Sequence, residues 1–220
     1  MEVYEKAKEF WNKHFDDAAV KIEGKFIDNK VFNNAVMSLY DEKGYVLDFG
    51  TGSGWGIFEL YFTRNFYRGY GIDQSINAIN YARECAKLSG LDNIIRFECD
   101  DMSAFKDDFF DAIFSVNTLD VVPLDITKEA LSQFKRVLKP NGKLLISLNP
   151  YIDNELNKRL KLDYIGENMY TRDGILRALN LTNDEWINLF SKYFKVLEVH
   201  DYELSFEKGY VRRMFILKNE

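Results

Sequence analysis

Strand-like and helix-like segments alternate along residues 45–148 of this chain. Apolar runs predict strands at 45–49, 68–73, 94–99, 111–116 and 143–148. Amphipathic stretches between them predict helices at 54–65, 75–89 and 125–138. Because strands joined by helices form a parallel sheet with helices on its faces, this order predicts an α/β fold.

The chain is expected to open with a helical cap and to close with a strand pair. Residues 1–41 have a helical, partly amphipathic pattern, and a capping box at the start of 182–194 predicts a further helix. Strand-like segments follow at 195–202 and 210–217. Their connection is too short for a crossover helix, so this last pair should be antiparallel.

Residues 149–180 follow the last predicted parallel strand and are less regular. Ligands of open α/β sheets bind beyond the carboxyl ends of the strands, and this stretch leaves such an end. Loops of this length are usually functional or disordered, and the apolar content here is too high for a disordered linker. We expect one domain over 1–220, in which this insertion and the segment around Trp11 and His14 form a lid.

A glycine loop, Asp48-Phe49-Gly50-Thr51-Gly52-Ser53-Gly54, joins the first strand to the first helix. Glycines let the backbone turn tightly and let a ligand approach main-chain N–H groups. The helix N-terminus that follows favours a carboxylate or phosphate. Asp73 ends the second strand, where a carboxylate can accept both hydroxyls of a ribose. At this spacing from the loop, Asp73 is better explained as a ribose ligand than as an ordinary helix cap.

A dinucleotide site is the main alternative for such a loop. The Gly-x-Gly-x-x-Gly pattern that begins at Gly50 needs a third glycine where the chain has Trp55. The pattern that begins at Gly52 fails in the same way at Ile57. Because the third glycine allows close helix–strand packing, these side chains argue against NAD.

The segment Val46–Gly54 resembles the first motif of the Rossmann-like (class I) methyltransferases, which use S-adenosylmethionine (SAM). Further segments resemble the later motifs in order: Gly71–Asp73, Phe97–Met102, Phe109–Ser115 and Arg136–Leu144. The resemblance implies a seven-stranded, mostly parallel sheet with an antiparallel last strand and helices on both faces. It also implies that SAM lies across the carboxyl ends of the first strands.

The resemblance implies a set of cofactor-binding residues: Asp48, Gly50, Thr51, Gly52, Ser53, Gly54, Asp73, Gln74, Asp100, Asp101, Met102 and Asn117. Within this set, Asp48 and the loop would hold the amino-acid end of SAM, and Asp73 would hold the ribose. Either Asp100 or Asp101 would accept the adenine amino group, because the segment can be aligned both ways. Asn117 would face the methionine moiety.

The chain departs from the family pattern after the fourth strand. Many small-molecule members carry a histidine near the position of Asp120, and enzymes that methylate amines of nucleic acid or protein carry Asn/Asp-Pro-Pro-Tyr. The run Asn117–Pro123 matches neither, which argues against base or protein-amide methylation. SAM carries its own leaving group, so alignment and exclusion of water can be sufficient for transfer. We therefore assign no catalytic residue; His14 and His200 are interpreted as surface and structural residues.

Composition restricts the partners that are expected. The net charge is −6 and there is no long Lys/Arg run, which disfavours nucleic acid. No signal peptide is recognisable, no apolar run reaches the length of about 18 residues that spans a bilayer, and Cys85 and Cys99 lack zinc-site spacing. We expect a cytoplasmic, metal-free enzyme that methylates a small molecule. The alternatives are a non-catalytic SAM-binding subunit and aminopropyl transfer from decarboxylated SAM.

Overall fold

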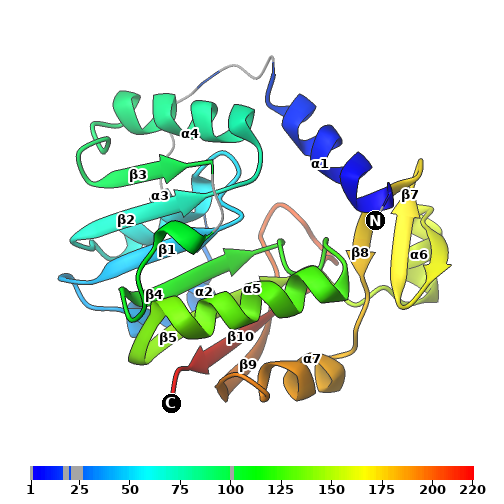
Figure 1. Cartoon of the computed structure of the whole chain (residues 1–220). Helices are drawn as coiled ribbons and strands as arrows, with labels where there is room; N and C mark the ends of the chain where they lie inside the picture. Colours follow the sequence, from blue (N-terminus) through cyan, green and yellow to red (C-terminus); the bar gives the residue numbers. More distant parts are fainter. Residues whose placement is uncertain (1, 17–19, 21–26, 100–101) are drawn as a thin grey trace.

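The computed structural model describes residues 2–16, 20, 27–99 and 102–220. The main sheet is built from β1 (Tyr45–Phe49), β2 (Arg68–Ile72), β3 (Ile95–Glu98), β4 (Phe110–Val116), β5 (Leu138–Leu148), β9 (Lys195–Tyr202) and β10 (Arg212–Lys218). Within the described residues these seven strands lie in the order β3-β2-β1-β4-β5-β10-β9 (Figure 1). The strands β1 to β5 pair in parallel, and β10 is antiparallel to both of its neighbours. The predicted fold class is therefore confirmed.

Helices cover both faces of this sheet. The helices of the described residues are α1 (Glu2–His14), α2 (Lys30–Leu39), α3 (Trp55–Thr63), α4 (Ile76–Leu88), α5 (Leu124–Val137), α6 (Asn154–Leu160) and α7 (Asn183–Phe190). Of these, α2, α3, α4, α5 and α7 pack on the sheet. One buried cluster joins the sheet to α2, α3 and α4, and a second joins it to α5 and α7. Val46 belongs to the first cluster and Leu47 to the second, because successive strand residues point to opposite faces.

Local sequence signals explain where several helices begin. The side chain of Ser75 accepts a hydrogen bond from Ala78 N and begins α4. Thr182 and Glu185 form the expected capping box at the start of α7. The strand β5 begins earlier than the sequence pattern predicts, at Leu138 rather than at residue 143. Leu138 pairs with Phe110, and the pairing with β4 then shifts in register, so the predicted turn lies within the strand.

Residues 149–180 form structure that the sequence pattern did not predict. After α6 come three antiparallel strands, β6 (Asp163–Gly166), β7 (Met169–Arg172) and β8 (Ile175–Leu179), which make a second sheet. Asp173 and Gly174 join β7 to β8 with positive φ angles of 56° and 72°. That Asp-Gly pair is a typical two-residue hairpin signal and could have identified the hairpin. A small apolar cluster that includes Ile152 and Leu156 packs this insertion.

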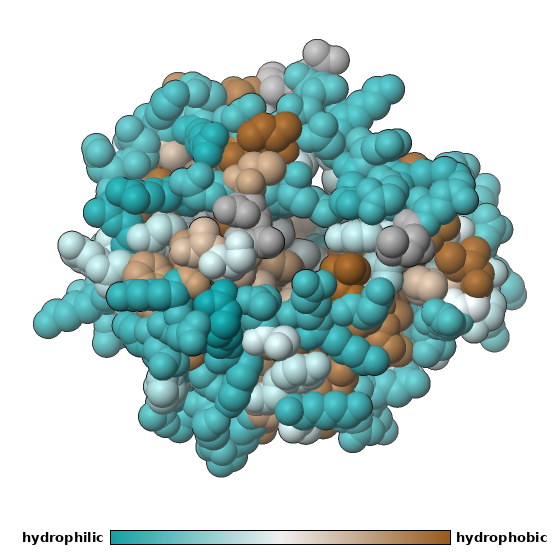
Figure 2. Space-filling view, in the orientation of Figure 1, coloured by the Kyte–Doolittle hydropathy of each residue, from teal (hydrophilic) through white to brown (hydrophobic). Residues whose placement is uncertain are grey.

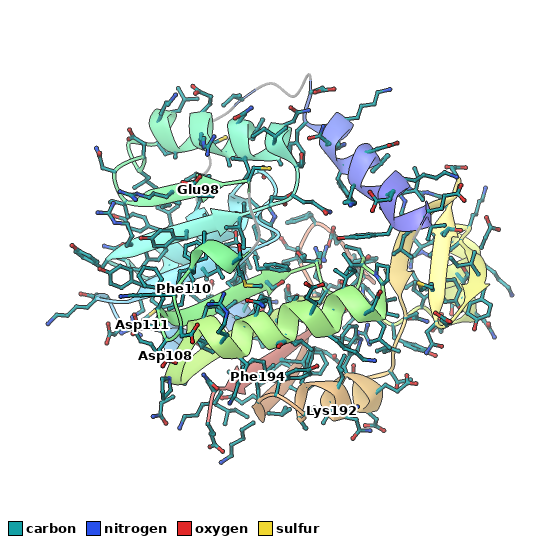
Figure 3. The ribbon with its side chains drawn as sticks, in the orientation of Figure 1. Glu98, Asp108, Phe110, Asp111, Lys192 and Phe194 are labelled. Atoms are coloured by element: carbon teal, nitrogen blue, oxygen red, sulfur yellow. The ribbon has the colours of Figure 1, made fainter. Side chains whose placement is uncertain are left out.

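The two ends of the parallel strands lie beside different parts of the chain. At the amino end of β4, Asp111 accepts hydrogen bonds from Tyr45 N and Lys139 Nζ at 2.8 and 2.7 Å, which ties neighbouring segments together. Asp108 and Asp111 are labelled in Figure 3 on this side. At the carboxyl side, α1 contacts both α4 and β8 (Figure 1).

Among the described residues, no helix is long and apolar enough to cross a membrane.

Candidate functional site

A cavity of about 580 Å³ lies at the carboxyl ends of β1, β2 and β4. This volume is typical of small-molecule sites. The strand order reverses between β1 and β4, and such a switch point is where open α/β sheets bind ligands. The walls come from the connections that follow these strands and from parts of α1 and α5. Figure 2 shows this face hollowed near its centre, between largely hydrophilic margins.

The glycine loop is fixed by hydrogen bonds to the end of β2. The amides of Gly50 and Thr51 both donate to Ile72 O, at 2.9 and 3.0 Å. The amide of Gly52 donates to Asp73 Oδ2 at 2.9 Å. Gly50, Thr51, Gly52 and Ser53 consequently form one wall of the cavity.

Gly54 supports the loop from behind the cavity. Its φ angle is +84°, and a Cβ atom there would lie 2.9 Å from the rings of Phe58 and Phe97. Left-handed backbone and close packing both require glycine at this position. Gly54 does not line the cavity, so its role in this structure is to let α3 begin against the sheet.

Asp48 is a buried support for the same loop. Its Oδ2 atom accepts hydrogen bonds from Thr51 Oγ1 at 2.7 Å and from Ile57 N at 3.1 Å. The side chain is 3% exposed and does not line the cavity. Burial raises the pKa of Asp48 to about 7, although the two hydrogen bonds act in the opposite direction.

Asp73 lies at the edge of the cavity with both carboxylate oxygens in use. Oδ2 accepts from Gly52 N and Oδ1 accepts from Ser75 N, each at 2.9 Å. A carboxylate oxygen can accept two hydrogen bonds, so each oxygen retains one position for a ligand hydroxyl. Burial raises the pKa of Asp73, while these backbone hydrogen bonds lower it. The geometry therefore fits a pair of ribose hydroxyls.

Asn117 lines the cavity just beyond β4 in a left-handed conformation with φ 54°. Arg212 Nη1 donates a hydrogen bond of 2.6 Å to its Oδ1 atom. Arg212 is 7% exposed, and its Nε and Nη2 atoms donate to Glu207 Oε2. Sequence reasoning missed Arg212 because 95 positions separate it from Asn117. An arginine at the start of a buried strand is a signal that a partner must exist.

Asp120 connects the main sheet to the insertion and does not line the cavity. Its Oδ2 atom accepts from Asn149 N at 2.6 Å, and its main-chain oxygen accepts from Leu179 N at 2.7 Å. Burial raises the pKa of this carboxyl group. Where the family resemblance implies a histidine in many members, this chain therefore has a buried carboxylate that connects two segments.

The helix α1 forms a roof over the cavity, with Tyr4, Ala7 and Trp11 on its walls. Tyr4 Oη donates to Gln74 Oε1 at 3.2 Å, and Asn12 Oδ1 accepts from Ser75 Oγ at 3.0 Å. These contacts join α1 to the segment that begins α4.

The other side of α1 rests on the insertion. The guanidinium of Arg177 in β8 lies 4.3 Å from the centre of the Phe10 ring. His14 packs against neighbouring aromatic rings and does not line the cavity. Among the described lining residues, none comes from 149–180, so the insertion carries the roof rather than forming it.

A family model matches the part of the chain that builds these walls. Residues 47–146 match a model described as a methyltransferase domain, and they include the glycine loop, Asp73 and Asn117. The chain therefore contains a methyltransferase domain, and residues 47–146, slightly less than half of its length, carry the match. A solved SAM-dependent methyltransferase from Methanosarcina mazei superposes on this methyltransferase with a TM-score of 0.72. At 23% identity, over 88% of this chain and 99% of the other, this likeness concerns the fold.

Curated relatives of this methyltransferase are named for different acceptors. The protein-lysine N-methyltransferase EFM4 of Saccharomyces cerevisiae is 30% identical over 64% of this chain and 66% of its own length. The tRNA N(3)-methylcytidine methyltransferase trm140 of Schizosaccharomyces pombe is 24% identical over 84% of this chain and 65% of its own length. The phosphoethanolamine N-methyltransferase of Plasmodium falciparum is 27% identical over 93% of this chain and 84% of its own length. The chain spans slightly less than two thirds of the first two relatives.

The structure brings together most of the residues that the methyltransferase motifs indicated. Gly50 to Ser53, Asp73, Gln74 and Asn117 line one cavity, where SAM is the cofactor of the family. Asp48 and Gly54 lie behind the loop, and Met102 is buried in the core. Asp100 and Asp101 lie outside the described residues, so the choice of adenine ligand stays a prediction.

Proposed function

We propose that this methyltransferase transfers the methyl group of SAM to a small molecule held beneath α1. The roof is the observation that carries the proposal. Tyr4, Ala7 and Trp11 of α1 line the cavity, and hydrogen bonds hold α1 to the start of α4. A roof of this kind favours an acceptor small enough to lie inside the cavity.

The described residues can perform the tasks that methyl transfer requires. SAM, when bound, supplies a methyl group on a sulfonium that is ready to be attacked. The Gly50–Ser53 loop would hold its amino-acid end, and Asp73 would accept its ribose hydroxyls. Trp11 would exclude water from the reacting atoms. Orientation of two reactants in such a site can lower the barrier by about 7–11 kcal/mol.

Protein and tRNA acceptors are the competing hypothesis, because two relatives are named for them. The net charge of −6 disfavours tRNA, whose binding depends on neutralised phosphates. A lysine side chain on a protein would have to pass the roof that α1 makes. The cavity therefore supports a small acceptor better than either macromolecule.

Labelled SAM tests the proposal directly. The full chain and labelled SAM are incubated in three separate reactions, which contain a metabolite extract, total tRNA or a protein extract. We expect label in the metabolite fraction and none above background in tRNA or precipitated protein. An Asp73→Ala variant serves as the control for label that does not depend on the site. Label in tRNA or protein alone would contradict the small-molecule acceptor.

The same assay separates the two remaining alternatives. A non-catalytic subunit would bind SAM in calorimetry yet transfer no label to any fraction. An aminopropyltransferase would use decarboxylated SAM and leave the methyl group in place. The loop from Gly50 to Ser53 supports SAM itself, because backbone N–H groups near a helix N-terminus favour the carboxylate that decarboxylated SAM lacks.

A further inference from the structure

The charges of the cavity walls restrict the acceptor, given the proposed methyl transfer on which this inference rests. Among the lining residues that the structure describes, Asp73 is the only carboxylate and none is lysine, arginine or histidine. Both oxygens of Asp73 already accept backbone hydrogen bonds, from Gly52 and Ser75. An anionic acceptor would therefore find no side-chain cation on these walls, and an unpaired buried ion is strongly disfavoured.

Apolar side chains gather between the connection that leads into α5 and the roof. Val121, Val122 and Ile126 line the cavity from that connection and the first turn of α5. Ala7 and Trp11 line it from α1. Such a wall stabilises a ligand by removing apolar surface from water. It provides no hydrogen bond or opposite charge to compensate a charged ligand for the water that it loses.

Three hydroxyl groups on the described walls, those of Thr51, Thr118 and Tyr4, donate hydrogen bonds within the protein and are poorly suited to remove a proton. Thr51 Oγ1 donates to Asp48, and Thr118 Oγ1 donates to Val116 O at 3.1 Å. Tyr4 donates to Gln74, and burial raises the pKa of Tyr4, so this phenol keeps its proton. A hydroxyl or carbon acceptor needs a base as it is methylated, whereas an uncharged nitrogen or a sulfur can attack through its lone pair.

We infer that the acceptor is an uncharged molecule with an apolar body and a nitrogen or sulfur nucleophile, bound against Val122, Ile126 and Trp11. The lone pair of the nucleophile forms the new bond to the methyl carbon as the bond between that carbon and the sulfonium breaks. The electrons of the broken bond return to sulfur and leave S-adenosylhomocysteine. A proton on the methylated nitrogen or sulfur, where there is one, passes to water afterwards.

Fractionation of a metabolite extract tests the charge of the acceptor. Ion exchange separates the extract into anionic, cationic and uncharged fractions, and each is incubated with the full chain and labelled SAM. We expect at least about tenfold more labelled product from the uncharged fraction than from either other fraction. Mass spectrometry should place the methyl group on nitrogen or sulfur. Product mainly from the anionic fraction, or an O-methyl or C-methyl product, would overturn the inference.

A charged variant tests the position of the acceptor. Ile126 is only partly buried, so Ile126→Lys should fold while it places a cation on the apolar wall. We expect at least a tenfold loss of product from the uncharged fraction, with the Kd for SAM within about twofold of wild type. Met37→Lys is the matched control, because Met37 is 49% exposed on α2 and does not line the cavity.

The possible outcomes distinguish this inference from the proposed function. If Ile126→Lys methylates the uncharged fraction as fast as the wild type, the acceptor does not bind at Ile126 and the assignment of this wall is wrong. If SAM binds the wild type but no fraction yields product, the proposed methyl transfer is contradicted. The inference about the acceptor is then contradicted as well, because it depends on that function.

Discussion

Replacing Asp48 by asparagine should change how the stability of the protein depends on pH. In the folded chain, burial raises the pKa of Asp48 from 3.8 to about 7. Because the folded-state pKa is the higher one, Asp48 contributes its full stability below about pH 4. That contribution is lost as pH rises through 7. This difference between the pKa values of the unfolded and folded states corresponds to a loss of stability on the order of 4 kcal/mol.

Asp48→Asn isolates this effect because it can preserve the local hydrogen bonds. A single oxygen, Oδ2, accepts from both Thr51 Oγ1 and Ile57 N, and an amide oxygen can take the same two bonds. The variant should therefore fold, and its stability relative to wild type should rise between pH 4 and pH 8. Burial also raises the pKa of Asp73 and Asp120, but these groups are common to both proteins and cancel in the difference.

Urea unfolding of both proteins at pH 4 and pH 8 measures the difference in the free energy of unfolding. Asp163→Asn, on the exposed face of β6, is the control for loss of one carboxylate. Equal pH dependence in wild type and Asp48→Asn would refute the argument from burial. Calorimetry on the same variant tests whether Asp48 contacts the cofactor. If Asp48 only supports the glycine loop, the Kd for SAM should stay within a few-fold of wild type. A loss above about 100-fold would indicate direct contact.

The remaining predictions concern the loop, the last strand and the insertion. Asp73→Ala should weaken SAM binding at least about tenfold in calorimetry, since hydrogen bonds to a charged group contribute about 1.5–3 kcal/mol; an unchanged Kd in a folded variant would exclude Asp73. Gly54→Ala should lower the free energy of unfolding by about 1–3 kcal/mol, because φ is +84° there. Arg212→Met should cost about 1–3 kcal/mol by leaving Glu207 without its partner, and unchanged urea unfolding would contradict this. Replacing 149–180 by a Gly/Ser linker should preserve SAM binding and reduce or broaden methyl transfer; unchanged transfer to the same acceptor would show that α1 needs no support.

The sequence by itself was sufficient for the order of β1 to β5 along the chain and for the glycine loop that joins β1 to α3. Those features are local: the period of an apolar run, a cap such as Ser75, and glycines at fixed spacing all act within one segment. Trp55 excluded the dinucleotide pattern for the same reason. The seven-stranded sheet followed from the resemblance of these motifs to a family, and the structure confirms it.

Tertiary structure decided the features that depend on residues far apart in the chain. The hydrogen bond from Arg212 to Asn117 and the engagement of Asp120 by Asn149 cannot be read from a local period. The place of α1 is decided in the same way, because Phe10 contacts Arg177, which belongs to the second sheet and lies far from Phe10 along the chain. Local patterns report which face of a segment is buried, whereas the partner that buries it is chosen by the packing of the whole chain.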